Sequence, residues 1–218
     1  MGEIVNVFGA TGLVGRELVQ QLIDHSLIER INLFVRRSSG FQNIKIHEFI
    51  VDFNRHEDWQ KWVTGDVVFI TMGTTLKQAG SKSNQYQVDF TYQYMAAQVA
   101  KENGVPTAIL VSSSGANEQS KLFYTKIKGE LEMAIQRLGF KRLVIFRPSL
   151  LTGKREKQRR AEQLAENILR PFTNFFFKKY RPIAGATVAR AMINAISNDF
   201  GDGVAIVELE EIFTLADQ

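Results

Sequence analysis

Cysteine is absent from the 218 residues of the chain, and its absence excludes several kinds of chemistry. Disulfide bonds, thiolate nucleophiles and zinc sites with cysteine ligands all need a residue that the chain lacks. The three histidines, His25, His47 and His56, are scattered at spacings unlike those of a metal cluster, so we expect no bound metal. The simplest location for such a chain is the cytoplasm, which we take as the expectation.

Long apolar runs are missing as well. No stretch approaches the roughly 20 apolar residues that a membrane-spanning helix needs. The first residues, MGEIVN, carry an acid where a secretory signal has basic residues, and Asn6 stands where a myristoylation signal has Ser or Thr. We therefore expect no membrane span, no secretory leader and no lipid anchor.

A strong excess of either charge is also lacking. The net charge is +4 and the isoelectric point is about 9.3, a mild excess that nucleic acid, an anionic membrane or a phosphorylated small ligand would each explain. The sequence has no recognised nucleic-acid-binding motif, so we expect no nucleic-acid partner. A hydrophobic content of 44% and a mean hydropathy of −0.13 are typical of a globular protein with a buried core.

The chain does have a regular alternation of apolar runs and segments with helical periodicity. Short runs rich in branched residues predict buried strands, and apolar stripes with a spacing of four predict helices between them. Strands are expected at 3–8, 31–36, 44–50, 66–71, 107–113, 142–148 and 204–209, and helices from Val14 onward, at 84–103, at 121–138, in parts of 155–180 and at 187–197. The alternation predicts an α/β fold with a Rossmann-type doubly wound parallel sheet. We expect a single domain over 1–218, in which 153–200 forms a small substrate-side lobe.

Three glycines follow the first predicted strand in the stretch GATGLVG, at Gly9, Gly12 and Gly15. Missing side chains let a pyrophosphate approach the backbone, and the start of a helix offers it free N–H groups and a partial positive charge. The alternative is a plain strand–turn–helix in which glycine serves geometry alone. A mononucleotide P-loop is disfavoured, because Arg16 and Glu17 follow where Lys and Ser or Thr are required. The residues that we expect to bind a dinucleotide here are Gly9, Thr11, Gly12, Leu13, Val14 and Gly15.

The end of the second predicted strand selects between the two pyridine dinucleotides. A protein that selects NAD places an acid there for the ribose hydroxyls, whereas this chain has Arg36 and Arg37. Because a guanidinium pairs with a 2′-phosphate that an acid would repel, we expect NADP(H) as the cofactor. The alternative is that both arginines are ordinary solvated loop charges.

Two further strand ends fit the same ligand. Asp52 and Phe53 follow the third predicted strand, where the adenine edge is expected to lie. Gly73, Thr74 and Thr75 follow the fourth, where small residues and hydroxyls would line the sugar and phosphate groups. Gly and Thr are common in loops, so each of these interpretations is weak without the glycine turn.

The fifth predicted strand ends in Ser112, Ser113 and Ser114, and the helix after it carries Tyr124 and Lys128. A spacing of four places Tyr124 and Lys128 on one helix face. An ammonium group beside a phenol stabilises the phenolate, so Tyr124 could act as a general acid toward a carbonyl oxygen as hydride reaches the carbon. Lys128 would also hold the nicotinamide ribose, and a serine of the cluster would hydrogen-bond the substrate oxygen.

Together GATGLVG, SSSGA followed by YTKIK, and FRPSLLTG resemble the short-chain dehydrogenase/reductase superfamily. FVRR, MGTT with KQAGS, QVDFTY and VARAMINAI resemble its atypical branch of Tat-interacting-protein-type oxidoreductases and their bacterial relatives. The resemblance covers nearly the whole chain and implies a Rossmann fold, NADPH binding and catalysis by Ser, Tyr124 and Lys128. Ser113 matches the atypical pattern best, while Ser114 matches the sugar-modifying members better. The resemblance also implies that Arg147 and Pro148 run beside the nicotinamide; the alternative is a strand end capped by proline.

The basic and aromatic stretch 153–182 fits a helix pair that caps the substrate cleft. A homodimer contact or an anionic substrate are the alternatives. We expect an NADPH-dependent reductase of a small carbonyl substrate. A non-catalytic NADP(H) sensor that acts through a protein partner is the second hypothesis. A nucleotide-sugar epimerase is the third, disfavoured because only about 70 residues follow the sixth strand.

Overall fold

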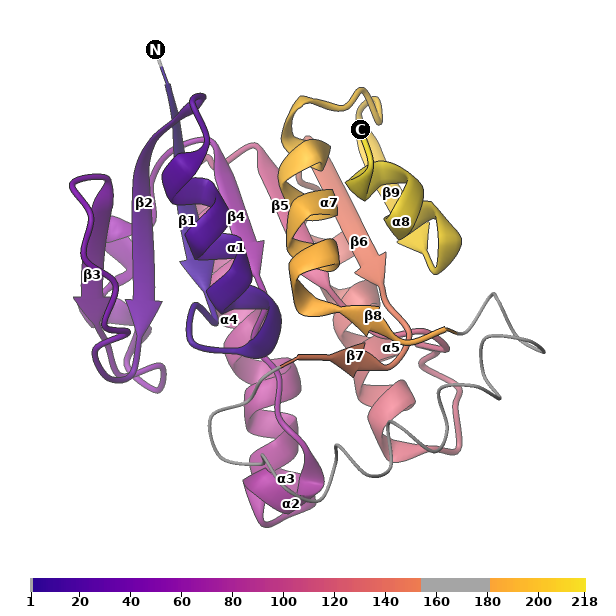
Figure 1. The fold of residues 1–218 in the computed structure, drawn as a ribbon. Helices are drawn as coiled ribbons and strands as arrows, with labels where there is room; N and C mark the ends of the chain where they lie inside the picture. Colours follow the sequence, from indigo (N-terminus) through magenta and orange to yellow (C-terminus); the bar gives the residue numbers. More distant parts are fainter. Residues whose placement is uncertain (1, 154–180) are drawn as a thin grey trace.

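The computed structural model describes residues 2–153 and 181–218, which form a parallel sheet covered on both faces (Figure 1). Seven strands pair in the order β3-β2-β1-β4-β5-β6-β9, and every neighbouring pair is parallel. The strands are β1 Glu3–Phe8, β2 Ile28–Val35, β3 Ile46–Ile50, β4 Val67–Ile70, β5 Thr107–Val111, β6 Arg142–Arg147 and β9 Gly203–Glu208. The predicted doubly wound α/β sheet is therefore confirmed, including its last short strand.

Helices cover the two faces of the sheet in separate groups (Figure 1). The helices α1 Leu13–Asp24, α7 Gly185–Ser197 and α8 Glu210–Ala216 share one hydrophobic core with the sheet. The helices α4 Tyr92–Glu102 and α5 Phe123–Gln136 share the other core. Shorter elements are α2 Leu76–Ala79, α3 Lys82–Tyr86, two 3-10 turns at His56–Asp58 and Gln60–Trp62, and the paired strands β7 Leu151–Thr152 and β8 Ile183–Ala184.

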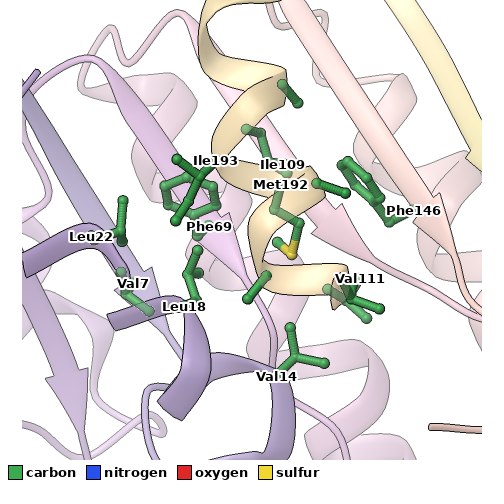
Figure 2. Packing of buried hydrophobic residues seen from close by; sticks show 14 of the residues in the cluster. Val7, Val14, Leu18, Leu22, Phe69, Ile109, Val111, Phe146, Met192 and Ile193 are labelled. Carbon is green, nitrogen blue, oxygen red and sulfur yellow. The ribbon is translucent and has the colours of Figure 1, made fainter. Parts of the chain in front are cut away.

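Successive residues of each central strand point to opposite faces, and helices cover both faces, which explains why these strands are mostly apolar. Asn6 of β1 is a buried polar exception. Figure 2 shows Leu18 of α1 and Met192 of α7 above Val7, Phe69 and Ile109 of the sheet, and all five are fully buried. Truncating a core side chain of this kind to alanine costs about 2–5 kcal/mol. The packing therefore fixes the position of α1, whose first turn follows the glycine-rich stretch.

The other face holds a cluster of aromatic rings below the β1–β2–β3 side of the sheet. The rings of Phe8 and Phe34 stack with centroids 4.6 Å apart, and Trp59 lies 5.6 Å from Phe8. Trp59 is 1% exposed and donates its indole N–H to the Asp52 carbonyl over 3.1 Å. The cluster thus anchors the chain immediately after β3.

The helix that we predict over 84–103 has two parts joined by an irregular turn. A π-helical segment, Gln87–Thr91, lies between α3 and α4. Gln93 donates its side-chain N–H to the Val88 and Asp89 carbonyls, which satisfies backbone groups in this wider turn. The predicted end of the helix is confirmed, because Gly104 follows with a φ of 81°. A π turn inside a helix is often found at a functional site, and this one contains Asp89.

The predicted substrate-side lobe over 153–200 stays a prediction, because more than half of it lies outside the described residues. Helix α7, inside the predicted substrate-side lobe 153–200, packs against α1 and buries Val188 and Met192 in the common core. This segment belongs to the body of the Rossmann layer because its apolar stripe faces the sheet. The predicted helices in 155–180 and the basic and aromatic stretch lie outside the described residues. Within 2–153 and 181–218, no helix combines the length and apolar character needed to cross a bilayer.

Candidate functional site

The glycine turn lies between β1 and α1, at the carboxyl end of the sheet. Gly9 has a φ of 99°, and a Cβ atom there would lie 2.7 Å from the backbone of Thr71 and Met72 after β4. A Cβ atom on Gly15 would collide with the Gly9 carbonyl. Backbone geometry therefore requires glycine at positions 9 and 15 whether or not a ligand binds, which agrees with the alternative of a plain strand–turn–helix. Gly12 is exposed and is the N-cap residue of the helix.

The first turn of α1 leaves donors for an anion. Gly12 is the N-cap residue and provides no side-chain cap, and the first helical bond runs from Arg16 N to Gly12 O over 3.0 Å. The N–H groups of Leu13, Val14 and Gly15 have no hydrogen-bond partner among the residues that the structure describes. Such a helix start suits a phosphate. The Val14 side chain is buried in the core, so only its backbone could serve a ligand.

Both arginines after β2 are exposed. Arg36 and Arg37 have no carboxylate within ion-pair distance in the described ranges. Arg16, in the first turn of α1, lies over the Phe41 ring at 5.6 Å, so a third guanidinium packs on the loop that Arg36 begins. The contact of Arg16 with Phe41 thus connects the start of α1 with the loop that carries Arg36 and Arg37.

The predicted ligand-binding residues after β3 and β4 differ in exposure and in hydrogen bonding. Asp52 is exposed and accepts a hydrogen bond from Asn54 N over 2.9 Å. The Phe53 ring is 8% exposed and packs 5.5 Å from the Tyr92 ring, so it belongs to the aromatic cluster. Its expected place at the adenine edge stays a prediction. Thr75 caps α2 by accepting from Gln78 N over 3.2 Å.

A buried ion pair connects the π-helical segment before α4 with α5. Lys128 Nζ lies 3.4 Å from Asp89 Oδ1, and the two side chains are 2% and 0% exposed. The other oxygen of Asp89 accepts from Thr74 N over 3.2 Å, and a Cβ atom on Gly73 would lie 3.4 Å from Asp89. Burial raises the pKa of Asp89 above its ordinary value, and the Lys128 ammonium and the Thr74 N–H offset part of that rise. Asp89 therefore holds the lysine against the predicted cofactor loop.

The predicted catalytic tyrosine lies one helical turn before this lysine. Tyr124 is 39% exposed at the start of α5. Ser113 is half-buried and donates its hydroxyl to the Ser114 carbonyl over 3.3 Å. Ser114 N donates to the Pro148 carbonyl over 2.9 Å, so the serine cluster and the turn after β6 lie together. The structure leaves the choice between Ser113 and Ser114 open, while Ser112 is buried against Glu132.

Arg147, at the end of β6, is bound by two carboxylates of the protein. Its Nη2 lies 2.6 Å from Glu132 Oε2 and its Nη1 lies 2.7 Å from Glu208 Oε1. The hydrogen bond to Glu132 raises the pKa of Arg147 above its usual range, with burial opposing and Glu208 adding to the rise. The guanidinium ties α5 and β9 to β6, and Pro148 behind it is buried. The expected position of Arg147 and Pro148 beside a nicotinamide stays a prediction.

Two of these charged residues, Asp89 and Glu132, were not among the site residues predicted from the sequence. Glu132 follows Lys128 by four residues on the same helix, and this spacing could have identified it as a member of the same face. Asp89 has no such signal, because its partner Lys128 lies on a helix far along the chain. Among the described residues, no group of three or more metal-ligating side chains comes together.

The sequence profile of a family described as NAD(P)H-binding matches residues 9–199. Protein FMP52, mitochondrial, of Candida albicans is 33% identical over 224 residues, an alignment that covers 96% of each chain. Protein HTATIP2 of Rattus norvegicus is 30% identical over 215 residues, which covers 97% of this chain and 88% of that protein. The matched region contains the glycine turn, the arginine loop, the serine cluster and α5.

Solved structures with the same fold are more distant in sequence. A short-chain dehydrogenase/reductase superfamily protein from Agrobacterium tumefaciens, with bound NAD, superposes with a TM-score of 0.70 at 15% identity and covers 94% of this chain and 77% of its own. UDP-glucose 4-epimerase from Thermotoga maritima, with UDP-glucose, gives a TM-score of 0.70 at 16% identity and covers 98% and 81%. At such low identity, these likenesses concern the fold alone.

Proposed function

The chain belongs to the NAD(P)H-binding family of atypical short-chain dehydrogenases/reductases, and from this premise we propose that it is an NADPH-dependent reductase of a small carbonyl compound. One observation carries the catalytic half of the proposal. A Tyr-x-x-x-Lys pair on an ordinary surface helix would expose both side chains, yet Lys128 is 2% exposed and paired with a carboxylate. Buried lysines of this kind are rare and are a feature of functional sites.

The residues present fit the proposed cofactor at three places. The unpartnered N–H groups at the start of α1 suit its pyrophosphate. The exposed guanidinium groups of Arg36 and Arg37 suit a 2′-phosphate. The loop that contains Gly73 and Thr74 would offer backbone groups to the sugar and phosphate groups of the cofactor. When bound, the cofactor would supply the hydride.

The chain's own residues would handle the proton. Tyr124 would donate its hydroxyl proton to the carbonyl oxygen of the substrate, because it is the exposed member of the pair. Lys128 would stabilise the resulting phenolate by its positive charge and hold the nicotinamide ribose. Ser113, or in its place Ser114, would hydrogen-bond the substrate oxygen and orient the carbonyl.

One observation supports the second hypothesis, a sensor that binds NADP(H) without catalysis. Asp89 already neutralises Lys128 at 3.4 Å, and a neutralised ammonium stabilises a phenolate less than a free one. A sensor would keep the cofactor site and transmit its occupancy to a protein partner. The third hypothesis, an epimerase, has support from fold likeness alone.

The two leading hypotheses are separated by a screen of small aldehydes and ketones that follows NADPH absorbance. The proposal expects turnover of at least one carbonyl compound and its loss by about 100-fold or more in Tyr124→Phe. Tyr94→Phe, on helix α4, is the matched control and should keep full activity. NADPH binding without turnover across the panel would favour the sensor, and turnover that Tyr124→Phe leaves unchanged would contradict the mechanism.

Location and assembly are further parts of the proposal. We propose a cytoplasmic protein, whereas the FMP52 relative is named mitochondrial. Fractionation of cells that produce the tagged full chain would decide between the two compartments. A homodimer is the proposed alternative to a monomer, and light scattering of the purified chain measures it.

A further inference from the structure

One buried carboxylate joins the helix that carries Tyr124 to the strand end that carries the serine cluster. Glu132, in α5, is 2% exposed, and its Oε1 accepts the hydroxyl of Ser112, a residue directly after β5 that is 4% exposed. Ser112 is itself fixed to the sheet, because its N–H donates to the Phe146 carbonyl over 2.8 Å. The next residue is Ser113, a predicted partner of the substrate oxygen. Glu132 therefore links the two segments that are expected to contact a carbonyl group.

The same carboxylate is held by the end of β6. Arg147 donates from Nε to Glu132 Oε1 over 3.0 Å and from Nη2 to Glu132 Oε2 over 2.6 Å, a two-point contact that fixes the plane of the carboxylate. Ser114 N donates to the Pro148 carbonyl over 2.9 Å, so the turn after Arg147 also contacts the serine cluster. Helix α5 and the ends of β5 and β6 thus meet at one carboxylate.

Neutralising the charge of Arg147 does not by itself require Glu132. The guanidinium has a second carboxylate, Glu208, whose Oε1 lies 2.7 Å from Nη1 and whose side chain is 42% exposed. Glu208 can balance the charge near the surface, whereas burying a further carboxylate costs desolvation energy. A buried ion pair is also weak evidence for stability, because apolar replacements of both partners are often as stable. The contacts of Glu132 therefore indicate a geometric role.

Glu132 lies in line with the predicted reacting residues. Tyr124, Lys128 and Glu132 follow one another at intervals of four in α5, so they share one helix face and are spaced about 6 Å apart along its axis. Lys128 is paired with Asp89 at 3.4 Å. This face of α5 therefore has two buried polar anchors. The first contacts the segment before α4, and the second contacts the strand end that leads into the serine cluster.

We infer that Glu132 and Ser112 are positioning residues for the proposed reaction: their hydrogen bond sets the distance between the serine cluster and Tyr124. The inference rests on the proposed function, in which a serine and the tyrosine bind the same carbonyl oxygen. A misplacement of about 1 Å between reacting groups can lower a rate by about 100-fold. Both side chains are buried, so each acts through a neighbour, Ser112 through Ser113 and Glu132 through α5.

Two substitutions at Ser112 separate the hydrogen bond from the volume of the side chain. Ser112→Ala removes the hydroxyl and leaves the pair of Glu132 and Arg147 in place, and we expect kcat to fall about tenfold. Ser112→Thr adds a methyl group but keeps the hydroxyl, so we expect kcat to stay within about threefold of the wild type. Glu132→Gln keeps the shape of the side chain but loses the charge that binds the guanidinium, and it should also lower kcat about tenfold. The dissociation constant for NADPH should change by less than about twofold in all three.

The experiment measures steady-state kinetics of each full-chain variant with the aldehyde or ketone that the wild type reduces fastest in the screen. Fluorescence titration gives the NADPH dissociation constants. Glu208→Gln is the matched control, because it removes a carboxylate from the same guanidinium without touching α5 or β5, and it should keep the wild-type kcat. Thermal unfolding verifies that each variant is folded at the assay temperature. If Glu132→Gln or Ser112→Thr does not fold, the comparison of Ser112→Ala with Glu208→Gln carries the test.

The outcomes separate the inference from the proposed function. A wild type whose turnover depends on Tyr124, with Ser112→Ala at full kcat, overturns the inference and leaves the proposed function standing. A folded Ser112→Thr as slow as Ser112→Ala also overturns it, because side-chain volume and not the hydroxyl would then be the cause. An NADPH dissociation constant that rises as much as kcat falls overturns it as well, because the effect would then lie in cofactor binding. A wild type that turns over no compound of the panel overturns both.

Discussion

The ion pair of Asp89 and Lys128 gives the sharpest prediction about stability. Lys128 Nζ and Asp89 Oδ1 are 3.4 Å apart with 2% and 0% of their side chains exposed. Removing one partner of such a pair leaves an uncompensated charge in the interior and costs about 3–5 kcal/mol. Replacing both partners by uncharged groups of similar volume is often close to neutral.

A double-mutant cycle measures this coupling. We expect Asp89→Asn and Lys128→Met each to lower the free energy of unfolding by about 3 kcal/mol or more, and the double variant to lose less than either. Urea denaturation followed by circular dichroism gives the four free energies, provided that the slope with urea is the same throughout.

The same helix offers a matched control pair. Lys126 Nζ and Glu130 Oε1 are 3.9 Å apart on the outer face of α5, with 51% and 31% of their side chains exposed. Their cycle should give a coupling of about 0.5 kcal/mol or less, because water screens exposed pairs. A coupling at Asp89 and Lys128 as small as at this control would refute the account of a buried neutralised lysine.

Three other variants test further parts of the structure. Glu132→Gln should lower the free energy of unfolding, measured by urea denaturation, by about 2–3 kcal/mol, because Glu132 is buried against Arg147. Glu208 pairs with the same arginine but is 42% exposed, so Glu208→Gln should lower it by under about 1 kcal/mol. Equal losses in the two variants would contradict this ranking. The pKa of Glu48 lies below its ordinary value of 4.5, so its charge stabilises the fold above that pH, and the contribution is lost as pH falls through the lowered pKa. Glu48→Gln should therefore lower the melting temperature at neutral pH and have little effect in acid, and a penalty that grows in acid would show the opposite sign. Val14→Ala should lower stability by about 1–2 kcal/mol without weakening NADPH binding, since only its backbone faces the ligand site.

The fold was predictable from the sequence because the strands of a covered parallel sheet have mostly apolar centres. The run at 142–148 and the amphipathic segment at 121–138 are examples of patterns that reflect burial directly. Strand ends then follow from topology, which is why the glycine turn, the arginines and the serine cluster could all be placed at one edge of the sheet. The boundaries differ by a few residues, since they depend on hydrogen bonds that no periodicity encodes.

The parts that could not be predicted depend on contacts between distant segments. Asp89 and Lys128 lie on separate helical segments that contact each other, and Glu48 on β3 contacts Ser39 in the loop after β2. Neither pairing leaves a local pattern in the sequence. The position of Phe53 after β3 suggested a ligand contact; its ring packs in the aromatic cluster, and the ligand contact stays a prediction.

We propose that the start of α1 and the loop after β2 bind the phosphorylated pyridine dinucleotide. Isothermal titration calorimetry of the full chain with NADPH and NADH tests it most directly, together with a variant in which Arg36 and Arg37 are both alanine. The account predicts that the wild type binds NADPH at least tenfold more tightly than NADH and that the variant loses this difference. Equal affinity for the two cofactors in the wild type, or no heat of binding with either, would contradict it.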